Sequence, residues 1–229
     1  MSSNMTDPKW KMIYLAKRNP ALAPEEFPQA WREHSALGKQ CRNVQDKVVG
    51  VAQCARLLTP LLAGVNTAYD GVNLLQLRDR QAANDIWSDP ETLAIMRPDE
   101  PRVFDRYVRD FTLVAREQTV HAGPLGEAVL VGFLKRRAHV APANFERALG
   151  LEPLPWPEVR RTVLNLVEPE RPAGYDFDAI LEWWFEDTAA MVSALQSFPC
   201  ATALPILHQT VCDSQASVLV ATRVSHRRP

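Results

Sequence analysis

Two histidines are candidates for moving a proton in a small-molecule site. His34 follows Trp31 in a stretch of helical periodicity, and His208 precedes the last apolar run of the chain. Imidazole titrates near neutral pH, which suits general acid–base catalysis, and a lone histidine is also a haem ligand in many proteins. The ordinary alternatives are an exposed helical side chain for His34 and a buried structural histidine for His208.

Tyr14, Asp70 and Asp178 are the other candidate catalytic residues. The Tyr14 hydroxyl would hydrogen-bond a ligand carbonyl or phenol if it faced a cavity, and would be satisfied locally if it lay in the core. Either aspartate would act as a general base if burial raised its pKa. Aspartates that begin an apolar run also accept backbone N–H bonds. Because both runs begin with one, the structural role is favoured.

Arg18, Trp31, Trp183 and Trp184 are candidate substrate contacts. The two adjacent tryptophans lie on a predicted strand and point to opposite faces, so one packs on helices and the other belongs to the core or walls a pocket. The sequence contains no nucleophile elbow, phosphate loop, dinucleotide fingerprint or metal-ligand pair at helical spacing. Hence we expect no metal site.

The charge balance excludes an electrostatic nucleic-acid surface. Lys and Arg total 26 against 27 Asp and Glu, and no block of like charge occurs before the Arg-rich end. That end, His226 to Arg228, is expected to be a solvated tail. No apolar run approaches the roughly 20 residues of a membrane span.

The N-terminal residues lack the apolar core of a secretory leader. The four cysteines (Cys41, Cys54, Cys200 and Cys212) have neither the spacing of a zinc site nor that of a disulfide framework. These features predict a cytoplasmic protein.

The first half of the chain predicts the element order strand-helix-strand-strand-helix-strand. Strands are expected at 12–16, 48–55, 69–77 and 111–117, a helix begins near Pro24 and ends near Asn43, and a second begins at Arg80. The interrupted stretch 57–68 is expected to be a loop over the mouth of a pocket.

The same order recurs in the second half, which indicates an internal repeat. Strands are expected at 128–136, 161–167, 177–185 and 215–223, with a short helix ending near Gly150 and another capped by Thr188. The joint at 121–126 divides the chain into a unit at 1–122 and a unit at 123–229.

The segment Leu22-Ala23-Pro24-Glu25-Glu26-Phe27, followed by Trp31-Arg32, resembles the start of the EthD family. The usual family histidine, four residues after the tryptophan, falls on Ser35 here, with His34 beside it. In the second half, Phe177-Asp178-Ala179 and the following apolar strand also resemble the family pattern. The resemblance implies ferredoxin-like units that pair into a dimeric α+β barrel, with a small-molecule site in the cavity between the sheets.

The predicted fold class is therefore α+β: two ferredoxin-like repeats packing sheet to sheet as a barrel, in a monomer with an intramolecular barrel or in a homodimer. The predicted function is a lyase or isomerase, free of cofactors, that transfers a proton on a small aromatic or polyketide-like compound in catabolism. Two alternatives stay open: a haem-dependent enzyme using His208 or His34, and a non-catalytic accessory protein of a degradation pathway. The expected partner is a small hydrophobic or aromatic ligand, with no nucleic acid and no membrane.

Overall fold

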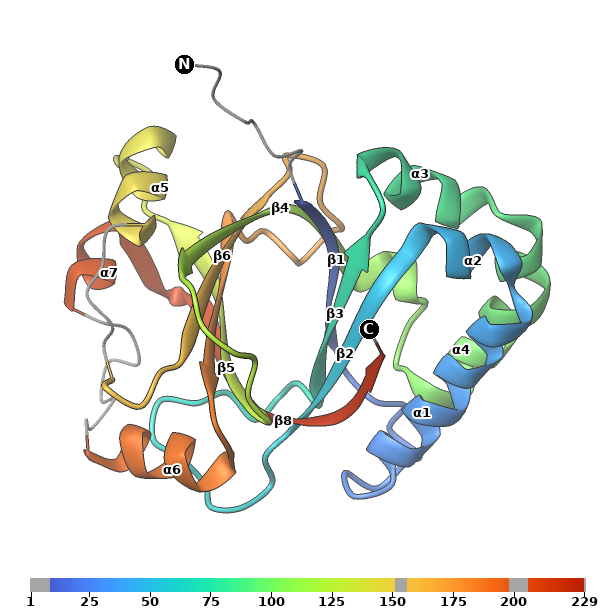
Figure 1. Cartoon of the computed structure of the whole chain (residues 1–229), viewed down its shortest axis with the longest axis horizontal. Coiled ribbons are helices and arrows are strands. Elements are labelled where there is room, and N and C mark those ends of the chain that lie inside the picture. The colour runs from blue at the N-terminus through green and yellow to red at the C-terminus, as the bar shows by residue number, and fades with distance from the viewer. Residues whose placement is uncertain (1–8, 151–155, 198–205, 229) are drawn as a thin grey trace.

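A closed antiparallel barrel forms the centre of the molecule in the computed structural model, which describes residues 9–150, 156–197 and 206–228 (Figure 1). Its strand order is β1-β3-β2-β8-β5-β7-β6-β4. The strands are β1 (Lys9–Ala16), β2 (Val48–Arg56), β3 (Gly71–Leu77), β4 (Thr112–His121), β5 (Ala128–Arg136), β6 (Arg161–Val167), β7 (Ala179–Phe185) and β8 (Cys212–Arg228). The predicted α+β barrel is thus confirmed, and it closes within one chain.

Helices cover the outside of the barrel on two opposite sides (Figure 1). One side carries α1 (Phe27–Leu37), α2 (Arg42–Lys47), α3 (Arg80–Ser88) and α4 (Glu100–Val103), and the other carries α5 (Pro142–Gly150), α6 (Thr188–Ser197) and α7 (Ile206–Val211). Short turns of other helical types are η1 (Gly38–Gln40), the π-helical η2 (Thr92–Met96), η3 (Arg97–Asp99) and η4 (Val108–Phe111). In the described part of the chain, no helix is long and apolar enough to cross a membrane.

The amphipathic pattern of α1 explains how it sits on the sheet. Phe27, Ala30, Trp31 and His34 recur at helical spacing and are the buried residues of this helix. The helix ends at Leu37, and α2 is separate, where the sequence predicts one helix to Asn43.

The N-cap of α6 lies one residue earlier than the predicted Thr188. The carboxylate of Asp187 accepts a hydrogen bond from the backbone N–H of Ala190 at 2.8 Å, while Thr188 is already helical. Aspartate is a strong N-cap because its side chain satisfies an otherwise unpaired N–H group of the first turn.

The two halves of the chain join along the edges of their sheets. Strand β2 pairs with β8, and β4 pairs with β6, both antiparallel. The sequence predicts sheet-to-sheet packing, but the structure connects the halves by backbone hydrogen bonds, so that their inner faces meet inside a continuous barrel. Closure leaves no exposed sheet edge.

The C-terminal residues close the barrel, which corrects the prediction of a solvated tail. His226 pairs with Gln53 and Arg228 pairs with Val51, both on β2. Strand β8 therefore extends five residues beyond the predicted Arg223, and it carries the only antiparallel link between β2 and the second half in the described chain. Charged residues are tolerated there because His226 and Arg227 remain exposed at this end of the strand.

The loop between β2 and β3 covers the second half, where it borders a hollow of only about 10 Å³ and not the mouth of a ligand-sized pocket as predicted. Its Leu57 and Asn66 N–H groups donate to the carbonyls of Ala221 and Leu219 on β8, at 2.9 Å and 2.7 Å. Leu62 and Val65 of the same loop pack on the apolar core of that half.

A buried ionic network inside the barrel connects the two halves. The Lys11 ammonium lies 2.6 Å from a Glu182 oxygen and 2.9 Å from a Glu117 oxygen. Asn165 and the Trp184 indole also donate to Glu182, at 2.8 Å and 2.9 Å. Burial opposes the charge on Lys11, but the two carboxylates outweigh it and raise the lysine pKa. Because a buried charge without its partner is strongly unfavourable, the pairing of Lys11 with both carboxylates favours this strand register over others.

Candidate functional site

A cavity of about 160 Å³ lies between the sheet of the first half and the helices that cover it. It therefore lies outside the barrel. The resemblance to the EthD family had instead implied a site inside, between the two sheets. The residues that line it are Tyr14, Trp31, Arg32, His34, Ser35, Ala36, Gly38, Lys39, Val44, Val48, Val51, Asn73, Leu75, Ile86, Trp87, Thr92, Met96, Glu100, Val108, His226 and Arg228. An apolar cavity of about 150 Å³ holds a benzene-sized molecule, so this one accommodates a single aromatic ring.

The sheet side of the cavity carries a row of polar side chains across five strands. Thr112 on β4 pairs with Tyr14 on β1, which pairs with Asn73 on β3. Asn73 pairs with Gln53 on β2, which pairs with His226 on β8. Residues directly opposite one another in antiparallel strands point to the same face. The strand register thus collects distant residues into one polar row that faces the helices.

Asn73 is the most informative member of this row. Its side chain is 3 % exposed, and its carboxamide oxygen has no hydrogen-bond partner among the described residues. The carboxamide oxygen of the neighbouring Gln53 also has no partner among the described residues, although its amide nitrogen donates to the Ser35 hydroxyl of α1; of the two, only Asn73 lines the cavity. A buried carbonyl oxygen without a partner costs about 1–3 kcal/mol, which a ligand O–H or N–H group at this position would recover.

His34 and Asp99 form a hydrogen-bonded pair on the helix side of the cavity. His34 Nδ1 lies 3.0 Å from Asp99 Oδ2, and Arg102 holds the same carboxylate at 2.7 Å. With Nδ1 donating to the carboxylate, Nε2 is the acceptor of the neutral ring. Burial lowers the pKa of His34, so the ring is neutral at pH 7. This is the arrangement of an oriented general base.

Glu100 and Tyr14 supply a second pair of titratable groups. Glu100 is buried and accepts the Val108 N–H at 2.8 Å. Burial raises the pKa of Glu100 above its usual range. The pKa of Tyr14 is also raised, first by burial and then by the nearby Glu100 charge, and a hydrogen bond with the Thr112 side chain opposes the shift only in part, so the phenol keeps its proton.

Of the predicted site residues, the structure brings Tyr14, Trp31 and His34 together at the cavity. Trp31 is fully buried there and stacks on Phe27 with ring centroids 5.1 Å apart. Its indole forms part of the apolar wall.

Arg18 and Asp70 lie at the end of β1, away from the cavity. Asp70 accepts the Arg18 backbone N–H at 3.0 Å and its guanidinium at 2.8 Å, and a second arginine, Arg56, lies 3.5 Å away. Arg18 also donates to the Leu22 carbonyl at 2.8 Å. This geometry is that of a structural aspartate that orders the turn after the strand.

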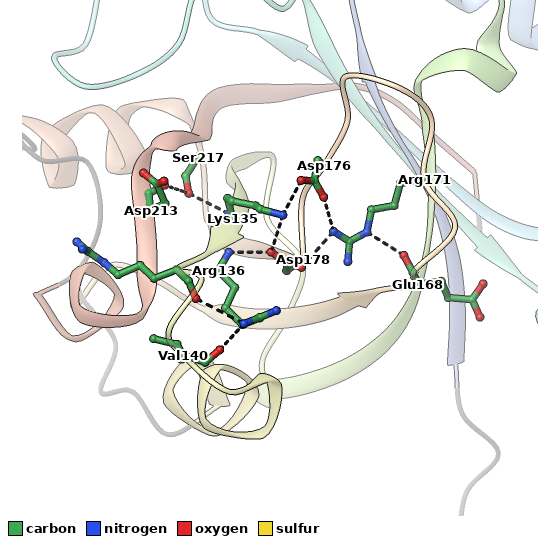
Figure 2. A network of polar contacts seen from close by, with 10 residues as sticks. Lys135, Arg136, Val140, Glu168, Arg171, Asp176, Asp178, Asp213 and Ser217 are labelled. Carbon is green, nitrogen blue, oxygen red and sulfur yellow. Dashed lines mark hydrogen bonds and ion pairs between the residues drawn. The ribbon is translucent and has the colours of Figure 1, made fainter.

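Asp178 repeats this arrangement in the second half (Figure 2). It accepts the Arg136 backbone N–H at 2.8 Å and pairs with Arg171 at 3.1 Å and Lys135 at 3.4 Å. Arg136 in turn donates to the Val140 carbonyl. The two aspartates therefore hold equivalent turns.

The remaining predicted residues lie in the core. Trp183 and Trp184 point to opposite faces, as predicted: Trp183 packs under the helices of the second half, and Trp184 lies inside the barrel. His208 on α7 is 1 % exposed, with its ring 6.1 Å from that of Trp183, and it does not line the described cavity.

The sequence interpretation missed Asn73, Glu100 and the basic residues of the cavity. The signal for Asn73 is a polar residue inside the run Val72-Asn73-Leu74-Leu75, at a position that faces the helices. Glu100 gave no signal, because it lies in a charged turn after Pro98 that is indistinguishable from a solvated loop.

Comparison with known proteins defines the fold. No protein-family model matches the chain, and no curated protein matches its sequence. Its structure is similar to that of an anthrone oxidase-like protein (TM-score 0.63, 10 % identity, covering 99 % of this chain and 95 % of that one). It is also similar to a putative monooxygenase from Fusobacterium nucleatum (0.51, 8 %, 96 % and 94 %) and to a mutant chlorite dismutase from Candidatus Nitrospira defluvii (0.50, 12 %, 96 % and 94 %). The chain thus has a fold of the dimeric α+β barrel type.

Proposed function

We propose that the chain is a cytoplasmic enzyme that moves a proton on a small aromatic compound, as a lyase or isomerase that needs no cofactor. The observation that carries this proposal is the neutral, carboxylate-oriented His34 in the wall of a cavity the size of one aromatic ring. Proton transfer requires only a positioned acid and base, and such groups contribute about 10²- to 10⁴-fold in rate.

In this mechanism His34 Nε2 takes a proton from a ligand carbon or hydroxyl. The Asp99 carboxylate stabilises the imidazolium that forms, and Arg102 keeps Asp99 ionised and in place. The protonated Tyr14 hydroxyl donates a hydrogen bond to the oxygen on which negative charge develops. Returning the proton to another atom gives an isomerisation, and expelling a leaving group gives a lyase reaction.

We also propose that the chain belongs to the EthD family and consists of two ferredoxin-like repeats, at 1–122 and 123–229. Equivalent hydrogen bonds in the two halves support the repeat: the Asp70 N–H donates to Ala16 and the Asp178 N–H donates to Leu134, both at 2.8 Å. Co-expressed halves that reassemble into a folded complex would support these boundaries, because the halves meet along hydrogen-bonded edges, in a shared core and through the loop between β2 and β3.

Haem is the alternative cofactor, and the available residues fit it poorly. Pockets for drug-sized ligands measure about 300–1,000 Å³, and the macrocycle exceeds the 160 Å³ of this cavity. His208 packs against Trp183 in a filled core. The contact of His34 Nδ1 with Asp99 would suit a ligating histidine, so for His34 the poor fit rests on the small volume of the cavity beside it. No group of three or more His, Cys, Asp or Glu among the described residues could hold a metal ion, and Cys200 lies outside them. A Soret band on adding haem, lost in His34→Ala or His208→Ala, would overturn the cofactor-free proposal.

Hydrogen–deuterium exchange tests the proton transfer directly. The protein is incubated in D₂O with single-ring phenols and aryl ketones, and loss of ligand C–H signals is followed by NMR. We expect exchange with at least one compound, and a decrease of about 10²- to 10⁴-fold in His34→Ala. His139→Ala, an exposed histidine of the second half, is the matched control and keeps the wild-type rate.

Two outcomes would contradict this proposal. Undiminished exchange in His34→Ala would remove the assigned base. Thermal stabilisation by a ligand without any exchange would instead favour the non-catalytic accessory protein, because binding to the native state raises the melting temperature without chemistry. Anthrone, a fused tricyclic compound, serves as an oversized probe that the cavity should exclude.

A further inference from the structure

Cationic side chains gather at the solvent-facing end of the cavity. Arg32 lies on α1, Lys39 on η1 and Arg228 at the end of strand β8. All three line the same cavity together with His226. Lys39 and His226 are exposed, and the two arginines are half-buried. The deep end, by contrast, is formed by the buried Trp31, His34, Asn73, Thr92 and Glu100.

These cations have no carboxylate partners in the part of the chain that the structure describes. Arg32 donates to the Gln29 amide oxygen, and Arg228 donates to the Val48 carbonyl at 2.8 Å. The exposed Arg102, by contrast, is paired with Asp99 and Glu33. Glu100 is the only carboxylate of the described residues that lines the cavity, and it lies at the deep end.

The electrostatic field of these residues converges on His226. Partial desolvation lowers the pKa of His226, although the side chain is exposed, and the charges of Lys39, Arg32 and Arg228 lower it further. The three cations all influence one imidazole and all line the cavity, so they lie close to one another. An anion placed among them would relieve their mutual repulsion.

We infer that the ligand of this cavity is a hydroxy-substituted aromatic carboxylate: its ring fills the cavity, its carboxylate lies among Arg32, Lys39 and Arg228, and its hydroxyl donates to the carboxamide oxygen of Asn73. This inference rests on the proposed function, because it names the substrate class of the same site. Arginine suits the role because its planar fork matches a carboxylate.

The size and polarity of the site support the same ligand. A cavity of about 160 Å³ holds the ring alone, so the carboxylate extends to the charged mouth. Asn73 is 3 % exposed, and its carboxamide oxygen, which has no partner among the described residues, is placed to accept a hydrogen bond from a ligand O–H or N–H group. Neither feature alone selects the ligand, but together they favour an anion at one end and a donor at the other.

A matched set of four single-ring compounds tests the inference by calorimetry on the full chain: 4-hydroxybenzoate, benzoate, 4-hydroxybenzamide and phenol. We expect 4-hydroxybenzoate to bind about tenfold more tightly than benzoate, which lacks the donor, and more tightly than the uncharged amide. Its affinity falls with added salt, whereas that of phenol does not.

Variants test which residues contact the carboxylate and which contact the hydroxyl of the ligand. Arg32→Gln and Lys39→Gln each weaken 4-hydroxybenzoate about two- to fivefold and leave phenol unchanged. Arg147→Gln, on α5 of the other half, removes the same charge without effect. Asn73→Leu makes 4-hydroxybenzoate and benzoate bind alike.

Equal binding of the acid and the amide, or an unchanged affinity of the acid in the Arg32→Gln Lys39→Gln double variant, would overturn the inference. The exchange experiment separates it from the proposed function. If 4-hydroxybenzoate binds in this pattern while no ligand exchanges protons, the ligand assignment stands and the enzymatic proposal fails. If neutral ligands exchange protons and the carboxylate brings no gain in affinity, the enzymatic proposal stands and the ligand assignment fails.

Discussion

The two halves of the barrel differ most in the sheet residues that face their helices. In the first half, Tyr14 and Asn73 are directly paired across β1 and β3 and border a cavity. In the second half, the equivalent pair across β5 and β7 is Gly132 and Leu181. The same arrangement of strands therefore has a polar, hollow layer on one side and an apolar, filled layer on the other.

The equivalence of these positions follows from the repeated turns. Tyr14 lies four residues before Arg18, and Gly132 lies four residues before Arg136, the two arginines whose N–H groups bind Asp70 and Asp178. The second-half row also continues with leucines, Leu219 on β8 and Leu164 on β6, where the first half has Thr112 and Gln53.

Large neighbours fill the second half where the first half has its cavity. A Cβ atom placed on Gly132 would lie 2.9 Å from a Leu219 methyl carbon and 3.1 Å from the Trp183 ring. The row position that holds a tyrosine in the first half thus holds no side chain in the second, because Trp183 and Leu219 occupy the space. The comparison shows that a few residues on the helix-facing side of the sheet decide whether the layer under the helices is a packed core or contains a cavity.

The largest effect is expected from Leu181→Asn, which gives the second half the residue of the first. The change removes a fully buried side chain and buries a carboxamide without partners. We expect a loss of about 3–5 kcal/mol in the free energy of unfolding, measured by urea titration. A loss below about 1 kcal/mol would show that the second half is not tightly packed.

Asp70→Asn and Asp178→Asn test whether the two halves share their turn chemistry. Each removes a carboxylate that accepts a backbone N–H and pairs with two cationic side chains. We expect both to lower stability by about 1.5–3 kcal/mol and neither to change ligand binding. If Asp70→Asn abolished proton exchange at unchanged stability, Asp70 would be a catalytic base after all.

Asn73→Leu makes the converse change, from the first half to the second. Because it removes a sealed carbonyl oxygen that has no partner, we expect a stabilisation of about 1 kcal/mol, together with the loss of hydroxyl recognition. Urea unfolding and calorimetry with 4-hydroxybenzoate measure the two effects. A destabilised variant would indicate that the carboxamide is needed for the packing of the first half.

The smallest effect concerns the pH dependence that His34 gives to the first half. Burial lowers the pKa of His34 in the folded chain below 6.5, its ordinary value in the unfolded chain. At a pH between these two pKa values, the unfolded chain binds the proton and the folded chain does not. Stability is therefore unaffected above pH 6.5 and decreases as the pH falls below it. His34→Gln should reduce the difference between unfolding free energies at about pH 7.5 and about pH 5.5. An unchanged difference would show that His34 does not titrate differently on folding.

Much of the element order was predictable because it depends on local patterns. Strands β5 and β6 begin and end at the predicted residues, since each is an apolar run with clear polar or proline boundaries. Of the candidate site, Tyr14, Trp31 and His34 were predicted from residue type and position alone. The end of β8 was not, because charged residues at a chain terminus resemble a solvated tail until a partner strand pairs with them.

The sequence by itself determined most of the strands, the position of the first helix and the aspartates that hold both turns, because these depend on hydrophobic periodicity and turn chemistry within short stretches. Only the tertiary structure decided where the site lies. Register across five strands places Tyr14 beside Asn73 and Gln53 beside His226, and barrel closure brings Arg228 to Lys39 at one cavity mouth. Alternation along a strand gives the face of each residue but not its neighbours on the next strand. Those neighbours are set by pairing between residues far apart in the chain.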